Sequence, residues 1–139
     1  MTRILAATLL IIASGAANAS RLDRPILSCD KAPLLGVFQK QLPDYILATT
    51  ADTQPKNLSP FPKQVAGPLS RRAMTSLICI VVAVDATGKA QAAEVSYPVG
   101  TKLNPQERQQ ILETKWSPAE QKGQARPSLV SVTIQIQHH

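Results

Sequence analysis

A continuous apolar run over residues 76–84 constrains the fold of this chain most strongly. After Ser76 it reads LICIVVAV. A run of this length is typical of a strand that is covered on both faces. The rest of the chain must therefore supply apolar residues to two sides of a sheet.

A tight turn follows this strand. Asp85, Ala86, Thr87 and Gly88 combine an acid that can accept local backbone N–H groups with a glycine that tolerates positive φ. Residues 89–97 are less apolar than the first strand. We expect them to form the more exposed return strand of a hairpin.

The next segment contains residues that are typical of the start of a helix. Asn104 predicts an N-cap, Pro105 suits the first helical position, and Glu107 completes a capping box. We expect Pro118 to stop this helix. The residues expected to share one helical face and pack on the sheet are Ile111, Leu112 and Trp116.

The last segment alternates between apolar and polar residues, with Gly123 marking a turn before it. Strict alternation predicts a half-buried strand over residues 129–137. The side chains expected to face inward are Val130, Val132, Ile134 and Ile136. Those expected to face outward are Ser131, Thr133, Gln135 and Gln137.

These elements predict a small α+β domain over residues 61–139, with an antiparallel sheet and one packed helix in the order strand, strand, helix, strand. Residues 20–60 are interpreted as an N-terminal extension. It is expected to hold a short helix, since Leu34, Leu35, Phe38 and Leu42 recur at helical spacing, and a polar loop from residue 49 onward.

Residues 1–19 are predicted to be a signal peptide. Arg3 precedes an apolar stretch, and Ala17-Asn18-Ala19 has the small-x-small pattern of a cleavage site. Retention of this segment as an anchor is the alternative. Cleavage would place the protein in the periplasm without a stable membrane span.

Two cysteines, Cys29 and Cys79, follow the leader. In an oxidising compartment an even pair is expected to form a disulfide. The other interpretation is that Cys79 is simply a small core residue of an apolar strand.

Charge and composition argue against binding to nucleic acid. The chain has 15 basic and 9 acidic residues, and the basic ones are scattered apart from Arg71 and Arg72. Nucleic-acid binding would need a basic stripe with interleaved aromatic residues. We therefore expect no nucleic-acid partner.

Catalytic groups are scarce. The only histidines, His138 and His139, are the last two residues of the sequence. Neither is a credible general base, and the pair lacks a third ligand for a metal site. Asp85 and Glu107 already have structural roles, and the sequence contains no glycine-rich phosphate loop. We expect a protein that is not an enzyme and needs no cofactor.

What remains is a binding role. A small sheet with one helix leaves a strand edge open, and the final strand carries no charged residue. This predicts a partner-binding edge that would add a partner's strand, made up of Leu129, Val130, Ser131, Val132, Thr133, Ile134, Gln135, Ile136 and Gln137. The alternative is that the segment tied by Cys29 covers this edge itself.

Several short motifs occur in a set order. Phe61-Pro62 comes first. It is followed by the hairpin motif Val84-Asp85-Ala86-Thr87-Gly88-Lys89-Ala90 and its return strand Ala93-Glu94-Val95. The remaining motifs are Lys115-Trp116, Pro118-Ala119, Gly123 and Pro127. In this order they resemble the C-terminal domain of TonB, the periplasmic part of an energy transducer. The resemblance covers residues 61–137.

The resemblance implies a periplasmic domain that recruits a short peptide of an outer-membrane receptor by strand addition along its final strand. The sequence contains no long Pro-rich spacer, so energy transduction is not implied.

Two functions remain open. We expect an interaction module that binds an outer-membrane receptor or secretion component of the cell envelope, linked to transport. The alternative is a small secreted disulfide-stapled inhibitor or immunity protein that acts on a periplasmic enzyme or toxin. Such an inhibitor would present a protruding loop, over residues 49–60 or 97–102.

Overall fold

The computed structural model describes Cys29 and residues 35–62, 65, 68–69, 71–72 and 77–135. The predicted leader and the residues after Gln135 lie outside the described residues. Ile136, Gln137, His138 and His139 are therefore not placed.

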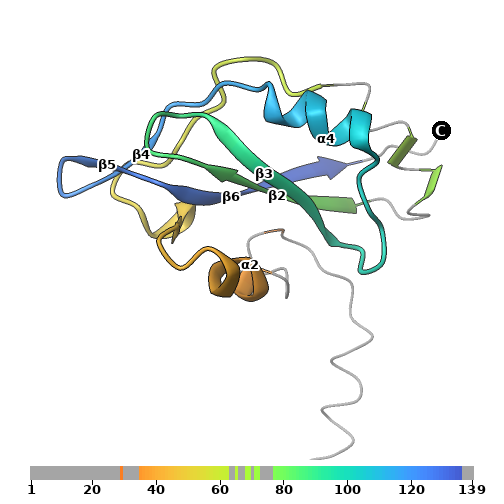
Figure 1. Ribbon diagram of the computed structural model, residues 1–139, viewed down its shortest axis with the longest axis horizontal. Coiled ribbons are helices and arrows are strands. Elements are labelled where there is room, and N and C mark those ends of the chain that lie inside the picture. Colours follow the sequence, from red (N-terminus) through yellow and green to blue (C-terminus); the bar gives the residue numbers. More distant parts are fainter. Residues whose placement is uncertain are drawn as a thin grey trace, which may run out of the picture.

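The main sheet has four strands in the order β1-β6-β2-β3 (Figure 1). The central strand β2 (Leu77–Val84) pairs antiparallel with β3 (Ala90–Tyr97) and with β6 (Ser128–Gln135). The short strand β1 (Ile46–Leu47) lies parallel to the start of β6. With one helix after the hairpin, α4 (Pro105–Leu112), this confirms the predicted α+β fold class.

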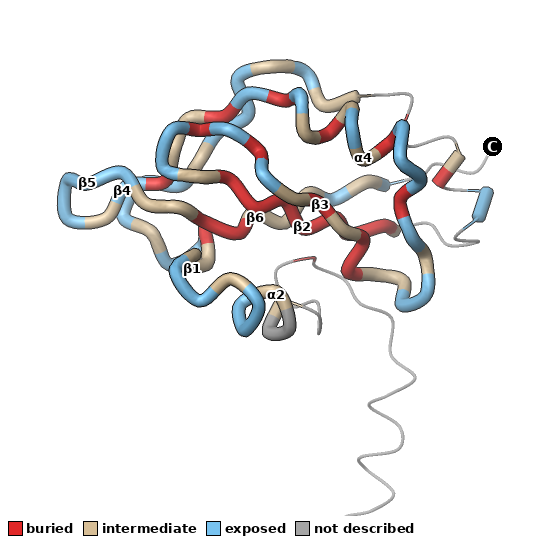
Figure 2. The backbone as a smooth tube through the Cα atoms, in the orientation of Figure 1, coloured by how far each residue is buried: buried red, intermediate tan, exposed pale blue. Residues whose placement is uncertain are grey.

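Two helices lie on opposite sides of this sheet, α4 on one and α2 (Leu35–Gln41) on the other (Figure 1). Every residue of β2 after Leu77 is buried (Figure 2). Side chains of a strand alternate between faces. On the α4 side, Ile78, Ile80, Val82 and Val84 join one core cluster, while Val81 and Ala83 join a second cluster on the α2 side. The prediction of a strand covered on both faces is confirmed.

The helix α4 begins as the sequence predicts. The Asn104 side chain accepts the Glu107 backbone N–H, and the Glu107 carboxylate accepts the Asn104 N–H, each at 2.8 Å. Glu107 is buried and also binds the guanidinium of Arg72. This contact ties a helical residue before β2 to the start of α4.

The predicted end of this helix is wrong. The helix stops at Leu112 and does not continue to Pro118. The Thr114 hydroxyl donates to the Ile111 carbonyl, and the Trp116 indole N–H donates to Thr114 Oγ1 at 2.9 Å. Thr114 therefore replaces the next helical turn with a local side-chain bond. Trp116 still enters the core, but from an extended segment rather than from a helical face.

The N-terminal extension is hydrogen-bonded to the domain at several points. α2 confirms the predicted short helix. Ile46 donates to the Pro127 carbonyl at 3.0 Å, and Thr53 exchanges backbone bonds with Glu120. Residues 56–59 then run beside residues 115–117. The expected loop from residue 49 onward is thus held against the domain.

A second hairpin follows that the sequence indicated only as a turn. Strands β4 (Ala119–Gln121) and β5 (Gln124–Arg126) form a separate two-stranded sheet. Lys122 and Gly123 connect them, both at positive φ. Two successive positive φ values are typical of the two-residue turns that suit the twist of a hairpin.

A disulfide joins Cys29 to Cys79, with the two Cα atoms 5.3 Å apart. Both cysteines are buried. The bridge attaches the N-terminal segment to the central strand of the sheet. This confirms the predicted pairing.

Cys29→Ala is expected to destabilise the protein strongly, because the bridge spans a sequence separation of 50 residues. Restricting the unfolded chain over such a loop contributes about 4 kcal/mol in the chain-entropy model. Urea unfolding of the oxidised protein and the variant measures the difference. Reduced wild-type protein is the matched control, and a variant as stable as the oxidised protein would refute a stabilising bridge. Thiol labelling of the native protein should find no free thiol.

Candidate functional site

The outer side of β6 is the first candidate site. Pro127 points its carbonyl toward β1, where it accepts from Ile46. Because backbone groups alternate in direction along a strand, Ser131, Thr133 and Gln135 direct their N–H and C=O groups away from β2. β1 pairs only with Ser128 and Leu129. Among the described strands, none pairs with the outer side of β6 beyond Leu129.

Charged side chains lie at the opposite edge of the sheet, which is β3. On β3, the Arg108 guanidinium donates to the Ala93 carbonyl at 3.4 Å and to the Glu94 carboxylate at 2.8 Å. Charged side chains on an edge strand oppose pairing with another chain. β6 carries no charged residue from Ser128 to Gln135. The two edges therefore differ in how open they are to a partner strand.

The predicted partner-binding residues fall into two groups. Val130, Val132 and Ile134 pack partly buried against the core on the α4 side, as the alternation predicted. Leu129 belongs to the core on the α2 side, and Thr133 and Gln135 are exposed. Ile136 and Gln137 lie outside the described residues. The extension covers the edge at Ser128 and Leu129 through β1.

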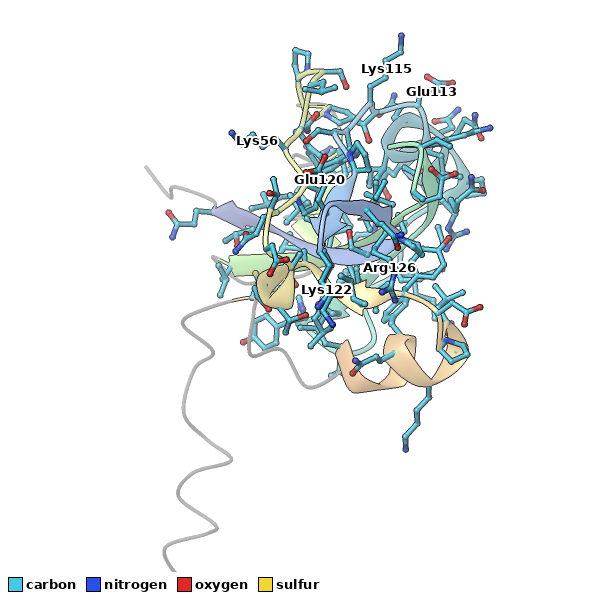
Figure 3. The ribbon with its side chains drawn as sticks, turned by 90° about the vertical axis from the view of Figure 1, so that its left-hand side faces the viewer. Lys56, Glu113, Lys115, Glu120, Lys122 and Arg126 are labelled. Carbon is cyan, nitrogen blue, oxygen red and sulfur yellow. A yellow bond between two sulfur atoms is a disulfide. The ribbon has the colours of Figure 1, made fainter. Side chains whose placement is uncertain are left out.

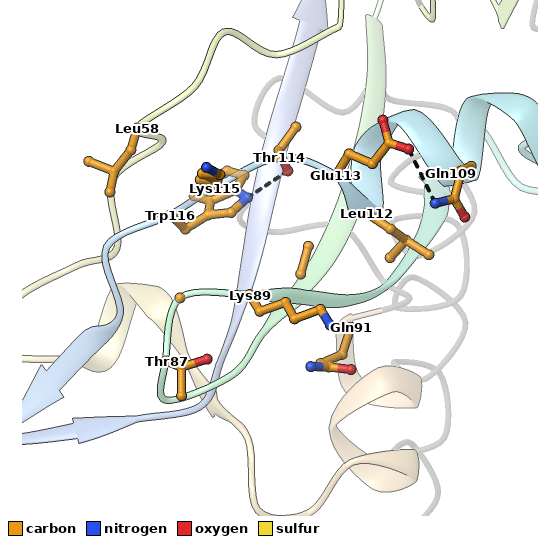
Figure 4. A pocket seen from close by; sticks show the side chains of 12 residues that line it. Leu58, Thr87, Lys89, Gln91, Gln109, Leu112, Glu113, Thr114, Lys115 and Trp116 are labelled. Atoms are coloured by element: carbon orange, nitrogen blue, oxygen red, sulfur yellow. Dashed lines mark hydrogen bonds between the residues drawn. The ribbon is translucent and has the colours of Figure 1, made fainter.

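A second candidate site is a groove that the sequence did not reveal (Figure 4). It has a volume of about 810 Å³ and opens between the end of α4, the β2–β3 turn and the loop that carries Leu58. Apolar groups come from Leu58, Ala90, Leu112 and Trp116. Polar groups come from Thr87, Lys89, Gln91, Gln109, Glu113, Thr114 and Lys115.

Backbone hydrogen bonds hold the walls of this groove together. Trp116 donates to the Gly88 carbonyl at 3.1 Å, and Leu58 donates to the Lys115 carbonyl at 2.8 Å. The backbone N–H of Lys115 donates to Ser59 Oγ at 2.9 Å. The segment 115–117 is thus bonded to the β2–β3 turn on one side and to the extension on the other. No local sequence signal predicts these long-range contacts.

The turn beside the groove is fixed by Asp85. One of its carboxylate oxygens accepts the backbone N–H groups of Thr87 at 2.8 Å and Lys89 at 2.9 Å, and the other accepts Gln91 Nε2 at 2.7 Å. Partial desolvation acts to raise the pKa of Asp85, but the hydrogen bonds outweigh it and lower the pKa to about 2. Burial, and secondly the charge of Asp85, raise the pKa of Tyr45.

The described residues contain no group of three or more His, Cys, Asp or Glu side chains that could hold a metal ion. In the same part of the chain, no helix is long and apolar enough to cross a membrane. No family model, no curated protein and no solved structure matches this chain.

Asp85→Asn should change how stability depends on pH. The pKa of Asp85 is about 2 in the folded protein against an ordinary value of 3.8. Its contribution to stability is therefore complete above about pH 4 and is lost as the pH falls toward 2. The variant should be less stable at neutral pH and lose less stability between pH 4 and pH 2.

Chemical denaturation at several pH values measures this difference. Asp44→Asn, at an exposed acid after α2, controls for removing one negative charge. Parallel stability curves for wild type and Asp85→Asn would contradict the role given to this carboxylate.

Gly88→Ala should destabilise more than Gly123→Ala. Both glycines have positive φ, +89° and +77°. An alanine in this left-handed conformation is strained, which lowers the free energy of unfolding by about 1–2 kcal/mol at either position. At Gly88 an added Cβ would also lie 2.1 Å from the Trp116 carbonyl oxygen, whereas at Gly123 it would meet nothing within 4 Å. Thermal and urea unfolding of the two variants isolate this close approach. Equal losses would show that the wall of the groove is not tightly held at Gly88.

Proposed function

We propose that this protein is a non-enzymatic interaction module of the cell envelope, which binds an extended peptide segment of a protein partner along the outer side of β6. The partner we propose is an outer-membrane receptor or a secretion component. The observation that carries the proposal is the difference between the two edges of the sheet.

An open edge presents unpaired N–H and C=O groups, which a partner strand satisfies. Beyond Leu129, β6 turns the backbone groups of Ser131, Thr133 and Gln135 outward. Its side chains add no charge that would repel a strand. The β3 edge, in contrast, has Arg108 bound to the Ala93 carbonyl. Strand addition is therefore favoured at β6.

The motif order that resembles the C-terminal domain of TonB supports the same edge, since that family recruits receptor peptides along its final strand. The first motif lies on the β2–β3 hairpin, Gly123 lies between β4 and β5, and Pro127 directly precedes β6. Lys115-Trp116 follows α4 in an extended segment and does not end the helix. The disulfide is compatible with an oxidising compartment such as the periplasm. A leader over residues 1–19 remains part of the proposal for location.

Thr133→Pro tests this proposal directly. Proline removes the N–H that Thr133 turns outward, and an outward-facing edge position tolerates proline in the fold. Thr133→Ala keeps the N–H and is the matched control. In affinity capture from envelope extracts, we expect wild type and Thr133→Ala to retain the same receptor or secretion component. Thr133→Pro should lose it while keeping the circular dichroism spectrum of the folded protein.

Thr133→Lys provides a second variant at an exposed position. A lysine on an edge strand opposes pairing and leaves the fold intact. Retention of the partner by both folded variants would overturn strand addition. Capture of a soluble hydrolase or toxin, unaffected by either variant, would support the inhibitor interpretation, for which Val99, 75% exposed in the turn after β3, is the natural contact.

A further inference from the structure

We infer that the groove beside the β2–β3 turn is a second binding site, which takes an organic anion with an apolar body. This site is defined by Leu58, Lys89, Leu112, Lys115 and Trp116. It is separate from the β6 edge, because no residue of β6 lines it. The inference does not depend on the function proposed above.

Two lysines of the groove lie opposite each other. Lys89 and Lys115 form an antiparallel bridge pair, so they stand directly opposite each other. Opposed residues on neighbouring antiparallel segments project to the same side, and two like charges there destabilise the pair. Both lysines are exposed and line the groove. An anion placed between them would relieve the repulsion.

Among the described residues, these two lysines have no ion-pair partner. The ion pairs of the described residues are Arg72 with Glu107 and Arg108 with Glu94, and neither includes Lys89 or Lys115. The one acid in the groove, Glu113, accepts a hydrogen bond from Gln109 at 3.3 Å (Figure 4). The groove therefore keeps a net positive charge.

The groove also has an apolar part. Leu58 is 67% exposed and lines the groove, so its apolar surface is open to a ligand. Leu112 is half-buried, and Ala90 and Trp116 add buried apolar surface. A volume of about 810 Å³ falls in the range of small-molecule pockets, about 300–1,000 Å³. An aromatic or aliphatic body fits this surface, with its anionic group at the lysines.

The walls of the groove are already in place. Gly88 is bonded to Trp116, and Leu58 to Lys115, through the backbone. The Trp116 indole is held by Thr114 (Figure 4). A ligand would therefore have to order only the ends of a few exposed side chains, which keeps the entropic cost of binding low.

Anilinonaphthalenesulfonate is a suitable probe, because it joins an aromatic body to one anionic group and fluoresces in apolar surroundings. Phenylnaphthylamine has the same body without the sulfonate. Trp116 is the single tryptophan of the chain and lines the groove, so a probe bound there must show energy transfer from it. We expect the anionic probe to bind more tightly than the neutral one and to show this transfer.

The variants separate charge from apolar contact. Lys89→Gln with Lys115→Gln should weaken binding of the sulfonate about five- to tenfold, as expected for two exposed charge contacts, and leave the neutral probe unchanged. Leu58→Ser should weaken both probes. Lys40→Gln with Lys122→Gln removes the same charge at exposed lysines that do not line the groove, and should change neither. Figure 3 shows Lys122 well apart from Lys115.

Three results would overturn the inference. One is equal affinity for the two probes in the wild-type protein. Another is an equal loss in both pairs of lysine variants, which would mean that only the net charge matters. The third is sulfonate fluorescence without energy transfer from Trp116. Thr133→Pro should bind the probe like wild type, which keeps this test independent of strand addition at β6.

Discussion

The structure depends on the burial of β2 from both sides. A strand whose residues from Ile78 to Val84 are all buried needs two apolar layers and a hydrogen-bonded neighbour on each side. α4 supplies one layer, with Ile111 fully buried against the sheet. α2 supplies the other, and the Cys29–Cys79 bridge attaches its segment to the same strand. The extension is therefore part of the fold, because without it the second face of β2 would be uncovered.

The central place of β2 also decides where the edges lie. Its neighbours β3 and β6 each have one side left for other partners. On β3, Arg108 and Glu94 occupy that side, and they can do so because α4 packs directly against this strand. On β6, β1 covers only the first two residues. The difference between the edges thus follows from which strand α4 crosses.

The sequence predicted those parts of the fold that depend on local signals. The apolar run predicted β2, and the turn residues predicted the hairpin. Asn104 and Glu107 predicted the start of α4. The sequence does not predict the end of α4, because Trp116 stands at a helical spacing from Leu112. The hydroxyl of Thr114, which bonds back to Ile111, ends the helix instead. A pattern of apolar residues does not show this competition between side chain and backbone.

The groove is not predictable from the sequence, for a different reason. Leu58 lies in a segment whose composition predicts only a loop, and its position depends on backbone bonds to Lys115. Lys89 and Lys115 are far apart in the sequence and become neighbours only when the segment after α4 pairs with the β2–β3 turn. Scattered lysines in a sequence indicate solubility, and only the fold places two of them opposite each other. The register between these segments has no local signal in the sequence.

The two candidate sites suit ligands of different chemistry. The outer side of β6 offers backbone donors and acceptors in alternation, and only another extended backbone can satisfy such a row along its length. In the groove, the Trp116 N–H already donates to the Gly88 carbonyl, and the Leu58 N–H already donates to the Lys115 carbonyl. What the groove offers is side chains, which are two lysines and the apolar groups of Leu58, Leu112 and Trp116. A peptide strand would gain little there, and a small organic anion would gain little along β6, so one small domain can hold both sites without competition between their ligands.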